Sequence, residues 1–412
     1  MSGVSRRGLI GGLGTAAATA AVAAAAPALL RNGEGASAAT PTAPTDTAYS
    51  FEGAHQAGIL TPVQRCASYV AFDVTAADRA ELVAMFRTLT EQSRFLMTGG
   101  TPPDHGLTAT TADDGILGPS VPADGLTVTT SVGASLFDGR FGLGARRPQR
   151  LVRMPAFDDD ALDRAWCDGD VLLQIGADNN DTVAHALRQI MRATRGALQP
   201  RWRMDGFQSP PRPSGTPRNL LGYKDGTANP STSDEDLMDQ LVWTHAGGGE
   251  PAWVEGGSYH VVRLIRMLVE FWDRVSVREQ NNIFGRDKAT GAPLTGSHEK
   301  DTPDYGDDGT GTPLIFGDAH IRRASNSGNP GGSRMLRRSF NYDRGVDANG
   351  NLDMGLIFTA FNQDLERQFA TVQRRLAGES LVDYILPYGG GYFFALPGVS
   401  GSGDWLGRGM FA

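Results

Sequence analysis

Cysteine is scarce in this 412-residue chain, which contains only Cys66 and Cys167. Zinc and iron–sulfur sites need clustered cysteine or histidine ligands, and no such spacing is present. The two thiols either form one disulfide or stay separate and buried, because each lies beside a strand-like run. The sequence patterns of zinc proteases, serine hydrolases, Walker loops and dinucleotide-binding folds are also missing from suitable contexts.

Positive charge is in deficit, with 38 Lys and Arg against 46 Asp and Glu and a formal net charge of -8. Binding to nucleic acid requires clustered basic residues, so this balance argues against a nucleic-acid partner. A hydrophobic content of 40% and a charged content of 20% are typical of a globular protein. One apolar run near the N-terminus is rich in Ala and Gly, and no second run follows it, which predicts no stable membrane span.

Residues 1–38 predict an export signal. Arg6 and Arg7 precede the apolar run, and "ASA" at residues 36–38 fits a cleavage site made of small residues. The stretch "SRRGL" resembles a twin-arginine signal, so we expect the twin-arginine export machinery as a partner. The mature protein is then extracellular, periplasmic or on the cell surface. Residues 39–47, rich in Pro, Thr and Ala, predict a disordered linker.

An internal repeat organises the rest of the chain. "DVLLQIGADNNDTVAHALRQIM" predicts a buried strand, a turn and a helix, and "MGLIFTAFNQDLERQFATVQRRL" repeats that plan about 190 residues later. The expected apolar helix faces are Val183, Leu187, Ile190 and Met191, and Leu365, Phe369, Val372 and Leu376. A second pair of segments, starting at Ala67 and Ser258, has the same offset. We therefore expect an α+β protein with two ferredoxin-like domains, antiparallel sheets with flanking helices, over residues 48–213 and 214–412.

The seven histidines show no ligand spacing that identifies a metal site. His185 is expected to cover a surface or core edge, and His260 to be a structural histidine in a strand. His320 differs, because "HIRRA" at residues 320–324 is followed by a second arginine cluster in "MLRRSFNY". A histidine near guanidinium groups suits a haem ligand with nearby partners for the propionates. The acidic stretch at residues 299–313 predicts a solvated loop rather than a calcium site.

These segments together resemble the dye-decolourising peroxidase family, in its exported class that includes deferrochelatase-like enzymes. The resemblance rests on Gly-x-x-Asp-Gly at residues 222–226, on "HIR" at residues 320–322 and on "MLRRSFNY". "LDMGLIFTAFNQDLERQF" and "PYGGGYFFALPG" also match the family pattern. The family implies a duplicated ferredoxin-like fold that encloses a haem b, held in the C-terminal domain.

The resemblance also implies roles for particular residues. Asp225 would be the acid-base carboxylate on the peroxide side of the haem, and Arg337, chosen over Arg338, would stabilise the developing charge. His320 would be the iron ligand, and its other ring nitrogen should donate to an acceptor that sets its basicity. Further haem contacts are implied for Gly226, Thr227, Ala228, Arg322, Ser325, Asn326, Leu356 and Phe358.

Three functions follow from this reading. The first is a peroxidase that uses hydrogen peroxide to oxidise dyes, phenols or another electron donor. The alternatives are a deferrochelatase that releases iron from haem, and a haem-binding protein without turnover, which has no need of a distal Asp–Arg pair. A bulky donor cannot reach a buried haem, so surface tryptophans or tyrosines are candidates for electron relay, among them Trp243, Trp253, Trp272 and Trp405. A homo-oligomer and an iron-uptake or redox partner protein both stay open.

Overall fold

The two halves of the chain repeat one order of strands and helices. The structure, a computed structural model, describes residues 47–325 and 332–412. The expected signal, the linker up to residue 46 and Asn326 therefore lie outside the described residues. The main elements of the N-terminal half are β1 (Cys66–Val74), α1 (Arg79–Thr98), β2 (Thr127–Gly133), β3 (Val171–Ala177), α2 (Asn180–Ala193) and β4 (Leu198–Phe207).

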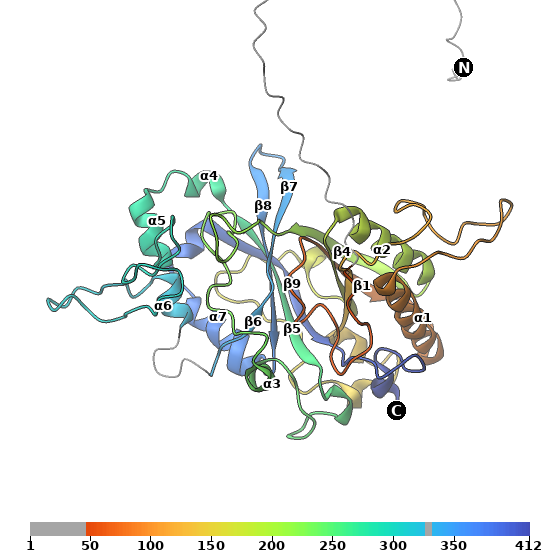
Figure 1. Cartoon of the computed structure of the whole chain (residues 1–412). Helices are drawn as coiled ribbons and strands as arrows, with labels where there is room; N and C mark the ends of the chain where they lie inside the picture. The colour runs from red at the N-terminus through yellow and green to blue at the C-terminus, as the bar shows by residue number, and fades with distance from the viewer. Residues whose placement is uncertain (1–46, 326–331) are drawn as a thin grey trace, which may run out of the picture. The chain divides into compact units, whose positions relative to one another are not determined.

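The short helix α3 (Glu235–Leu241) precedes the strands of the C-terminal half, and Figure 1 shows both halves side by side. Its strands are β5 (Ser258–Met267), β6 (Leu336–Arg337), β7 (Phe340–Val346), β8 (Leu352–Asn362) and β9 (Ile385–Ala395). Its helices are α4 (Val269–Trp272), α5 (Val277–Phe284), α6 (His320–Ala324), the π-helical turn η5 (Glu366–Ala370) and α7 (Thr371–Leu376).

The strand order shows the duplication directly. The strands of the N-terminal half are arranged β2-β3-β1-β4, and all their pairings are antiparallel. In the C-terminal half β5 lies between β8 and β9, and β6 and β7 pair with β8. Counting β6 and β7 as one interrupted strand, both halves have the ferredoxin-like order with the first strand between the third and the fourth. The predicted fold class is confirmed.

The two halves share one sheet, and the described residues belong to one compact unit. β5 pairs with both β8 and β9, so the sheet closes on itself. The seams between the halves are short, with residues 131–133 of β2 paired to β9 and one pair, Phe207 with Asn341, joining β4 to β7. Alternate side chains fill the inside of this closed sheet, because successive residues of a strand point to opposite faces; they include Tyr69, Trp202, Val262, Leu264, Tyr342, Ile357 and Phe393.

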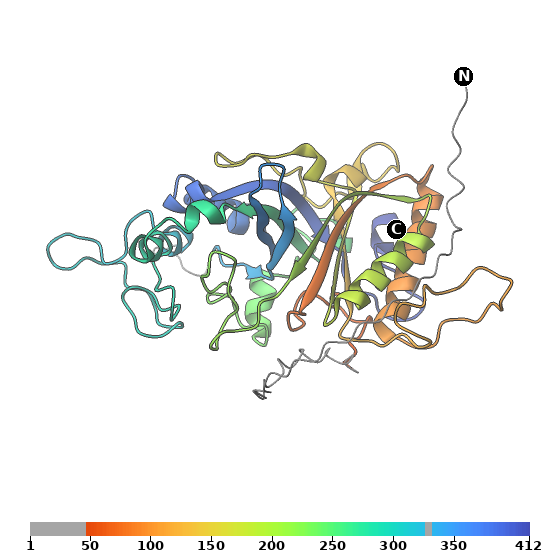
Figure 2. The same cartoon turned by 90° about the horizontal axis from the view of Figure 1, so that it is seen from above.

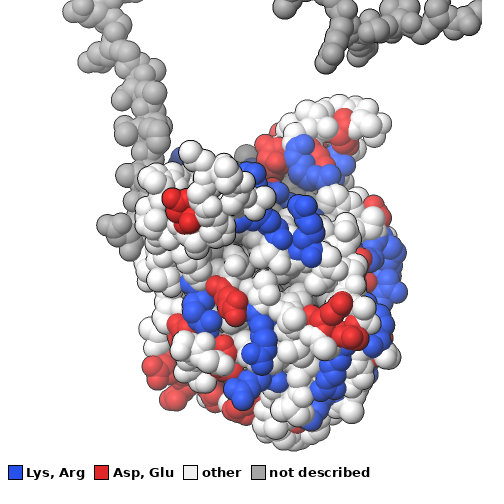
Figure 3. All heavy atoms as spheres, turned by 90° about the vertical axis from the view of Figure 1, so that its right-hand side faces the viewer, with Lys and Arg blue, Asp and Glu red and all other residues white. Residues whose placement is uncertain are grey.

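Helices α1 and α2 pack together over the other face of the N-terminal strands (Figure 2). Asp78 caps α1 by accepting from the backbone N–H groups of residues 80 and 81. In α2 the expected core residues Val183, Leu187 and Ile190 are buried, but Met191 is 36% exposed, so that prediction was wrong. At about 100° per residue, position 191 lies at the margin of the stripe that the other three define. The face that carries α1 and α2 mixes Lys and Arg with Asp and Glu (Figure 3).

The helices of the C-terminal half lie differently. Leu365 and Phe369 are buried, but Val372 and Leu376 are only half-buried, because α7 faces a cavity rather than a filled core. The same cavity is bordered by β5, β8 and β9 on its sheet side. The space that apolar packing fills in the N-terminal half is therefore partly open in the C-terminal half.

Both cysteines are free thiols, which answers the question that the sequence left open. Cys66 is half-buried at the start of β1 and Cys167 is buried beside β9. Burial raises the pKa of both thiols, which keeps them protonated near neutral pH. Among the helices described here, none combines the length and the apolar character needed to cross a membrane.

Candidate functional site

The candidate site is the cavity of the C-terminal half, with a volume of about 440 Å³. Apolar side chains of β5, β8, η5 and α7 form much of its wall, and charged side chains also line it, among them Asp225, Arg263, Arg286, Arg334 and Arg337. Such a cavity lies in the size range of small-molecule and cofactor sites. Of the residues implied by the family resemblance, those that line it are Asp225, Gly226, Thr227, Ala228, His320, Ser325, Arg337, Leu356 and Phe358.

His320 is the first residue of α6, and its side chain is 28% exposed within this cavity. Its Nδ1 lies 2.8 Å from Oε2 of Glu379, a carboxylate that is itself buried. Burial disfavours the charged ring, but Glu379 outweighs that effect, so the pKa of His320 is raised. The sequence predicted an acceptor for this ring nitrogen without identifying it. Since Nδ1 donates to Glu379, Nε2 is left for a ligand in the cavity.

Asp225 and Arg337 meet at the cavity wall, where Oδ1 of the aspartate lies 3.5 Å from Nη1 of the arginine. This distance is too long for a strong hydrogen bond, so the carboxylate is close to a positive charge without being locked to it. Both side chains are partly exposed, at 23% and 26%. They are brought together from the loop after β4 and from the two-residue strand β6.

Asn229 holds Arg337 in position through hydrogen bonds. This residue was not identified from the sequence. Its Nδ2 donates to the carbonyl of Arg337 at 2.8 Å, and its Oδ1 accepts from the Arg337 amide and Nε. Asn229 lies four residues after Asp225, so one loop supplies both the carboxylate and the support of the arginine. An asparagine in a loop has no sequence signal that separates such a role from an ordinary turn.

Arg338 points away from the cavity, which supports the choice of Arg337. Its side chain is buried and donates to the carbonyl of Thr61 and to Oε1 of Gln64. Burial lowers the pKa of Arg338 to about 10. The two arginines diverge because neighbouring residues of an extended strand project to opposite faces.

The turn that carries Asp225 is anchored by a buried ion pair. Lys224 Nζ lies 2.6 Å from Oε2 of Glu299, with side chains 4% and 11% exposed. Glu299 also accepts from Thr216 and Thr227. Glu299 begins the stretch that was predicted to be a solvated loop, and this residue contradicts that prediction because its carboxylate is turned inward. Gly226, with a φ of +99°, makes the reversal that places Asp225 at the wall.

Arg322, expected to contact the haem, is not among the residues that line the cavity. Its guanidinium donates to the carbonyl of Ile315 at 2.6 Å and lies over the ring of Tyr305. Arg322 is two positions after His320, and residues two apart on a helix face nearly opposite sides. Arg334, which the sequence analysis did not select, lines the cavity instead. Ser325 does line it, and Asn326 lies outside the described residues.

The tryptophans proposed as electron relays are all buried: Trp243, Trp253, Trp272 and Trp405. Trp166 is half-buried and lies edge-on to Tyr388, with ring centroids 6.0 Å apart. His260, as expected, is a structural histidine. It is fully buried in β5, between the hydroxyls of Ser131 and Thr359 at 2.9 and 2.8 Å.

The cavity suits a haem on three structural grounds. It is largely apolar, it presents a histidine whose second nitrogen is held by a carboxylate, and an Asp–Arg pair also lines it. A carboxylate that accepts from the ligating histidine is the usual support of an iron or zinc ligand. Arg334 brings a positive charge into the cavity, which suits the acidic edge of a porphyrin.

Comparison with known proteins agrees with this geometry. Residues 56–208 match the family model "Dyp-type peroxidase, N-terminal" and residues 216–400 match "Dyp-type peroxidase, C-terminal". The chain is 51% identical over 366 residues to proteins named deferrochelatase from Shigella flexneri and from Escherichia coli (strain K12). The alignment covers 87% of this chain and 87% and 86% of those relatives.

Solved structures give the same result. A DyP-type peroxidase from Cellulomonas bogoriensis has a TM-score of 0.80 at 37% identity, over 89% of this chain and 99% of that one. Ferric DtpA from Streptomyces lividans has a TM-score of 0.79 at 36% identity, over 89% and 98%. The two family models together cover most of the chain, and the alignments cover 86–87% of the curated relatives and 98–99% of the two solved structures. The chain belongs to the Dyp-type peroxidase family, and it is a haem-dependent oxidoreductase that acts on peroxide.

Proposed function

We propose that this protein is a haem b peroxidase in which Asp225 and Arg337 act on hydrogen peroxide and His320 holds the iron. The observation that carries the proposal is the convergence of these three side chains on one apolar cavity. Haem, when bound, supplies the iron that binds peroxide and receives its oxidising equivalents. The electron donor is a dye, a phenol or another reductant.

Asp225 is the proposed proton carrier. Its carboxylate would take the proton from one oxygen of hydrogen peroxide and return it to the other oxygen, which leaves as water while the haem iron would receive the first oxygen. The 3.5 Å separation from Arg337 leaves the carboxylate able to accept and release that proton. Arg337 stabilises the negative charge that develops as the O–O bond lengthens, and Asn229 keeps it in place.

Other side chains of the cavity would hold the haem. His320 Nε2 is the proposed iron ligand, with Glu379 keeping the ring oriented and basic. Gly226, Thr227 and Ala228, next to Asp225, would contact the haem, and Leu356 and Phe358 would form an apolar wall beside it from one face of β8. Arg334 replaces Arg322 as the proposed partner of a propionate.

A deferrochelatase activity is the second candidate, because the curated relatives at 51% identity carry that name. It uses the same cavity, so the two activities are separated by their products. Incubation with haem and a ferrous chelator under reducing conditions should give metal-free porphyrin fluorescence if iron is released. Peroxide-dependent oxidation of a phenol without metal-free porphyrin would favour the peroxidase alone. The Asp–Arg pair argues against a haem carrier without turnover.

Export by the twin-arginine route is also a proposal, and residues 1–38 lie outside the described residues. It is supported by Arg6 and Arg7 before an apolar run. The mature protein would then act in the periplasm, at the cell surface or outside the cell. Self-association and a redox or iron-uptake partner remain proposals that depend on that location.

Stopped-flow absorbance tests the peroxidase proposal. The haem-loaded variants Asp225→Ala and Arg337→Leu should show at least about a hundredfold slower absorbance change on mixing with hydrogen peroxide, as expected for lost acid-base or charge stabilisation. Asp236→Ala, an exposed aspartate of α3, is the matched control and should react at the parent rate. Parent rates in both cavity variants would show that neither residue acts on peroxide.

A further inference from the structure

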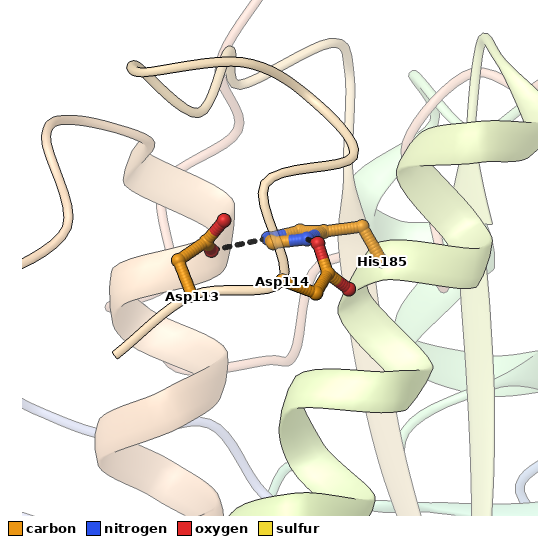
Figure 4. A group of neighbouring side chains, drawn as sticks. All are labelled: Asp113, Asp114 and His185. Atoms are coloured by element: carbon orange, nitrogen blue, oxygen red, sulfur yellow. Dashed lines mark hydrogen bonds and ion pairs between the residues drawn. The ribbon is translucent and has the colours of Figure 1, made fainter. Parts of the chain in front are cut away.

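A buried histidine–carboxylate cluster lies in the N-terminal half, outside the cavity. Asp113 and Asp114 belong to the long connection between α1 and β2, and His185 belongs to α2; their side chains point toward one another (Figure 4). The His185 side chain is 1% exposed, Asp114 2% and Asp113 11%. One ligand atom from each lies within 4.8 Å of the others. The burial of His185 contradicts its expected place at a surface or core edge.

The two nitrogens of His185 have different surroundings. Nδ1 lies 2.8 Å from Oδ1 of Asp114, a carboxylate that only accepts, so Nδ1 carries a proton. Nε2 is buried without a hydrogen-bond partner and lies 3.4 Å from Oδ2 of Asp113. In a neutral ring Nε2 is an acceptor, and an acceptor facing a carboxylate oxygen is repelled by it. A cation between the two atoms, either a second ring proton or a metal ion, removes this repulsion.

The separation of the two atoms favours a metal ion. A charge-assisted hydrogen bond brings its nitrogen and oxygen to about 2.7–2.9 Å, which is shorter than the 3.4 Å found. Zinc bonds of about 2.0–2.2 Å in tetrahedral geometry put neighbouring ligand atoms about 3.3–3.6 Å apart. The Nδ1 contact with Asp114 is the carboxylate support that metal-bound histidines usually have.

The neighbouring positive side chains do not neutralise the carboxylates of this cluster, so a cation would be attracted to it. Gln189 donates to Oδ2 of Asp113 at 3.0 Å, and this neutral amide leaves the charge of Asp113 uncompensated. Arg188 approaches Asp114 at 3.6 Å, but its side chain is 63% exposed, so water screens its charge. Arg192 donates to the carbonyls of Thr111 and Ala112 and does not reach the carboxylates.

We propose that Nε2 of His185 and the carboxylate of Asp113 bind a divalent first-row metal ion of the zinc class, with Asp114 orienting the histidine. Imidazole together with carboxylate is a ligand set suited to such ions, and water completes the coordination. The ion fastens the connection that carries Asp113 to α2. None of the three residues lines the haem cavity, so the ion has a structural role.

Zinc binding to the haem-loaded, tag-free protein tests the proposal. After treatment with EDTA and removal of the chelator, calorimetric titration with zinc near neutral pH should show one saturable site, with metal analysis giving about one zinc per chain. His185→Gln and Asp113→Asn should each weaken binding at least tenfold, the lower end of what loss of a metal-site group costs. Asp113→Asn keeps an oxygen that accepts from Gln189, so this variant still tests the site if His185→Gln does not fold.

His245→Gln is the matched control, because the His245 ring also faces two carboxylates, Asp239 and Glu255, but is 46% exposed. Its zinc affinity should equal that of the parent. Zinc should also slow proteolysis within residues 101–120 of the parent and not of Asp113→Asn. The proposal is overturned if the parent binds no zinc, or if Asp113→Asn binds it as tightly; a second ring proton then bridges the cluster.

Discussion

Asn229 holds Arg337 through its backbone and its side chain at once. The carbonyl of Arg337 accepts from Asn229 Nδ2 at 2.8 Å, and its amide and Nε donate to Asn229 Oδ1 at 3.2 and 3.4 Å. Because Asn229 follows Asp225 in the same loop, any movement of this loop shifts the carboxylate and the guanidinium together. The two groups proposed to act on peroxide are thus positioned by one loop.

Asn229→Ala should slow the reaction with hydrogen peroxide by about ten- to a hundredfold, because a misplaced charged group loses much of its effect. Haem content should be unchanged, since the proposed iron ligand, His320, lies on another element, α6. Stopped-flow rates at several pH values test this, and Asn229→Asp, which keeps the acceptor for Arg337, should recover part of the rate. A variant that loses haem and rate in parallel would show that Asn229 only supports the fold.

Glu379→Gln should weaken haem retention about ten- to a hundredfold, because His320 loses the anionic acceptor that orients its ring and raises its basicity. The ferric–ferrous midpoint potential should rise, since a less basic ligand stabilises ferric iron less. Haem transfer to apomyoglobin and spectroelectrochemistry measure the two effects. Glu366→Gln, an exposed glutamate with 62% of its side chain accessible, is the control and should change neither quantity.

Glu299→Gln should lower the free energy of unfolding by about 3–5 kcal/mol near neutral pH, because it leaves the Lys224 ammonium buried without its partner. Although burial opposes ionisation, hydrogen bonds from Lys224, Thr216 and Thr227 lower the pKa of Glu299 to about 2. A depressed carboxyl pKa gives stability above the unfolded value of 4.5 that is lost as pH falls toward 2. Urea unfolding should therefore show the difference between parent and variant narrowing below about pH 4.5. A difference independent of pH would contradict this, and Glu91→Gln, at an exposed site, is the control.

His260 should make the protein less stable in acid. Burial lowers the pKa of His260 to about 3. Between pH 6.5 and 3 this histidine is therefore protonated in the unfolded chain but neutral in the folded chain. Stability is lost as pH falls between these values, by up to about 5 kcal/mol. His260→Gln should remove this component, so its unfolding free energy should depend less steeply on pH than that of the parent. His298→Gln, at a site 84% exposed, should keep the parent slope.

Arg6→Lys combined with Arg7→Lys should trap the precursor inside the cell, because the twin-arginine machinery reads the arginine pair. Cell fractionation followed by immunoblotting measures the distribution of precursor and mature chain. A variant with Arg31→Lys, which lies beyond the apolar run, is the control and should be exported normally. Unchanged secretion of the double variant would exclude this route.

The fold could be predicted from the sequence because the strand and helix patterns of each half are visible in short stretches of the chain. Strand-like runs before helices at the same offset gave the duplicated α+β architecture, and the strand order agrees with it. The closure of the two halves through β5, β8 and β9 could not be predicted, because pairing between distant strands leaves no local signal. Met191 was misjudged since it lies at the margin of a helical stripe.

The motif residues of the site could be predicted, and their supports could not. Asp225, His320 and Arg337 stand in recognisable patterns, and the structure brings them to one cavity. Glu379 is 59 positions from His320, in a stretch with no motif, and only the fold brings the two together. Arg322 follows His320 by two positions but points elsewhere, because residues close in sequence do not share a direction on a helix.

The cavity that α7 borders in the C-terminal half links cofactor loading to folding. In the N-terminal half, Leu187 and Ile190 of α2 complete an apolar interior from protein atoms alone. In the C-terminal half, Val372 and Leu376 of α7 border a cavity of about 440 Å³. A bound ligand would therefore cover much of the apolar surface of these two side chains. A ligand that binds the folded state alone shifts the folding equilibrium toward that state. We therefore expect the N-terminal half to reach its final packing first, and the C-terminal half to mature when haem enters as the last part of its interior.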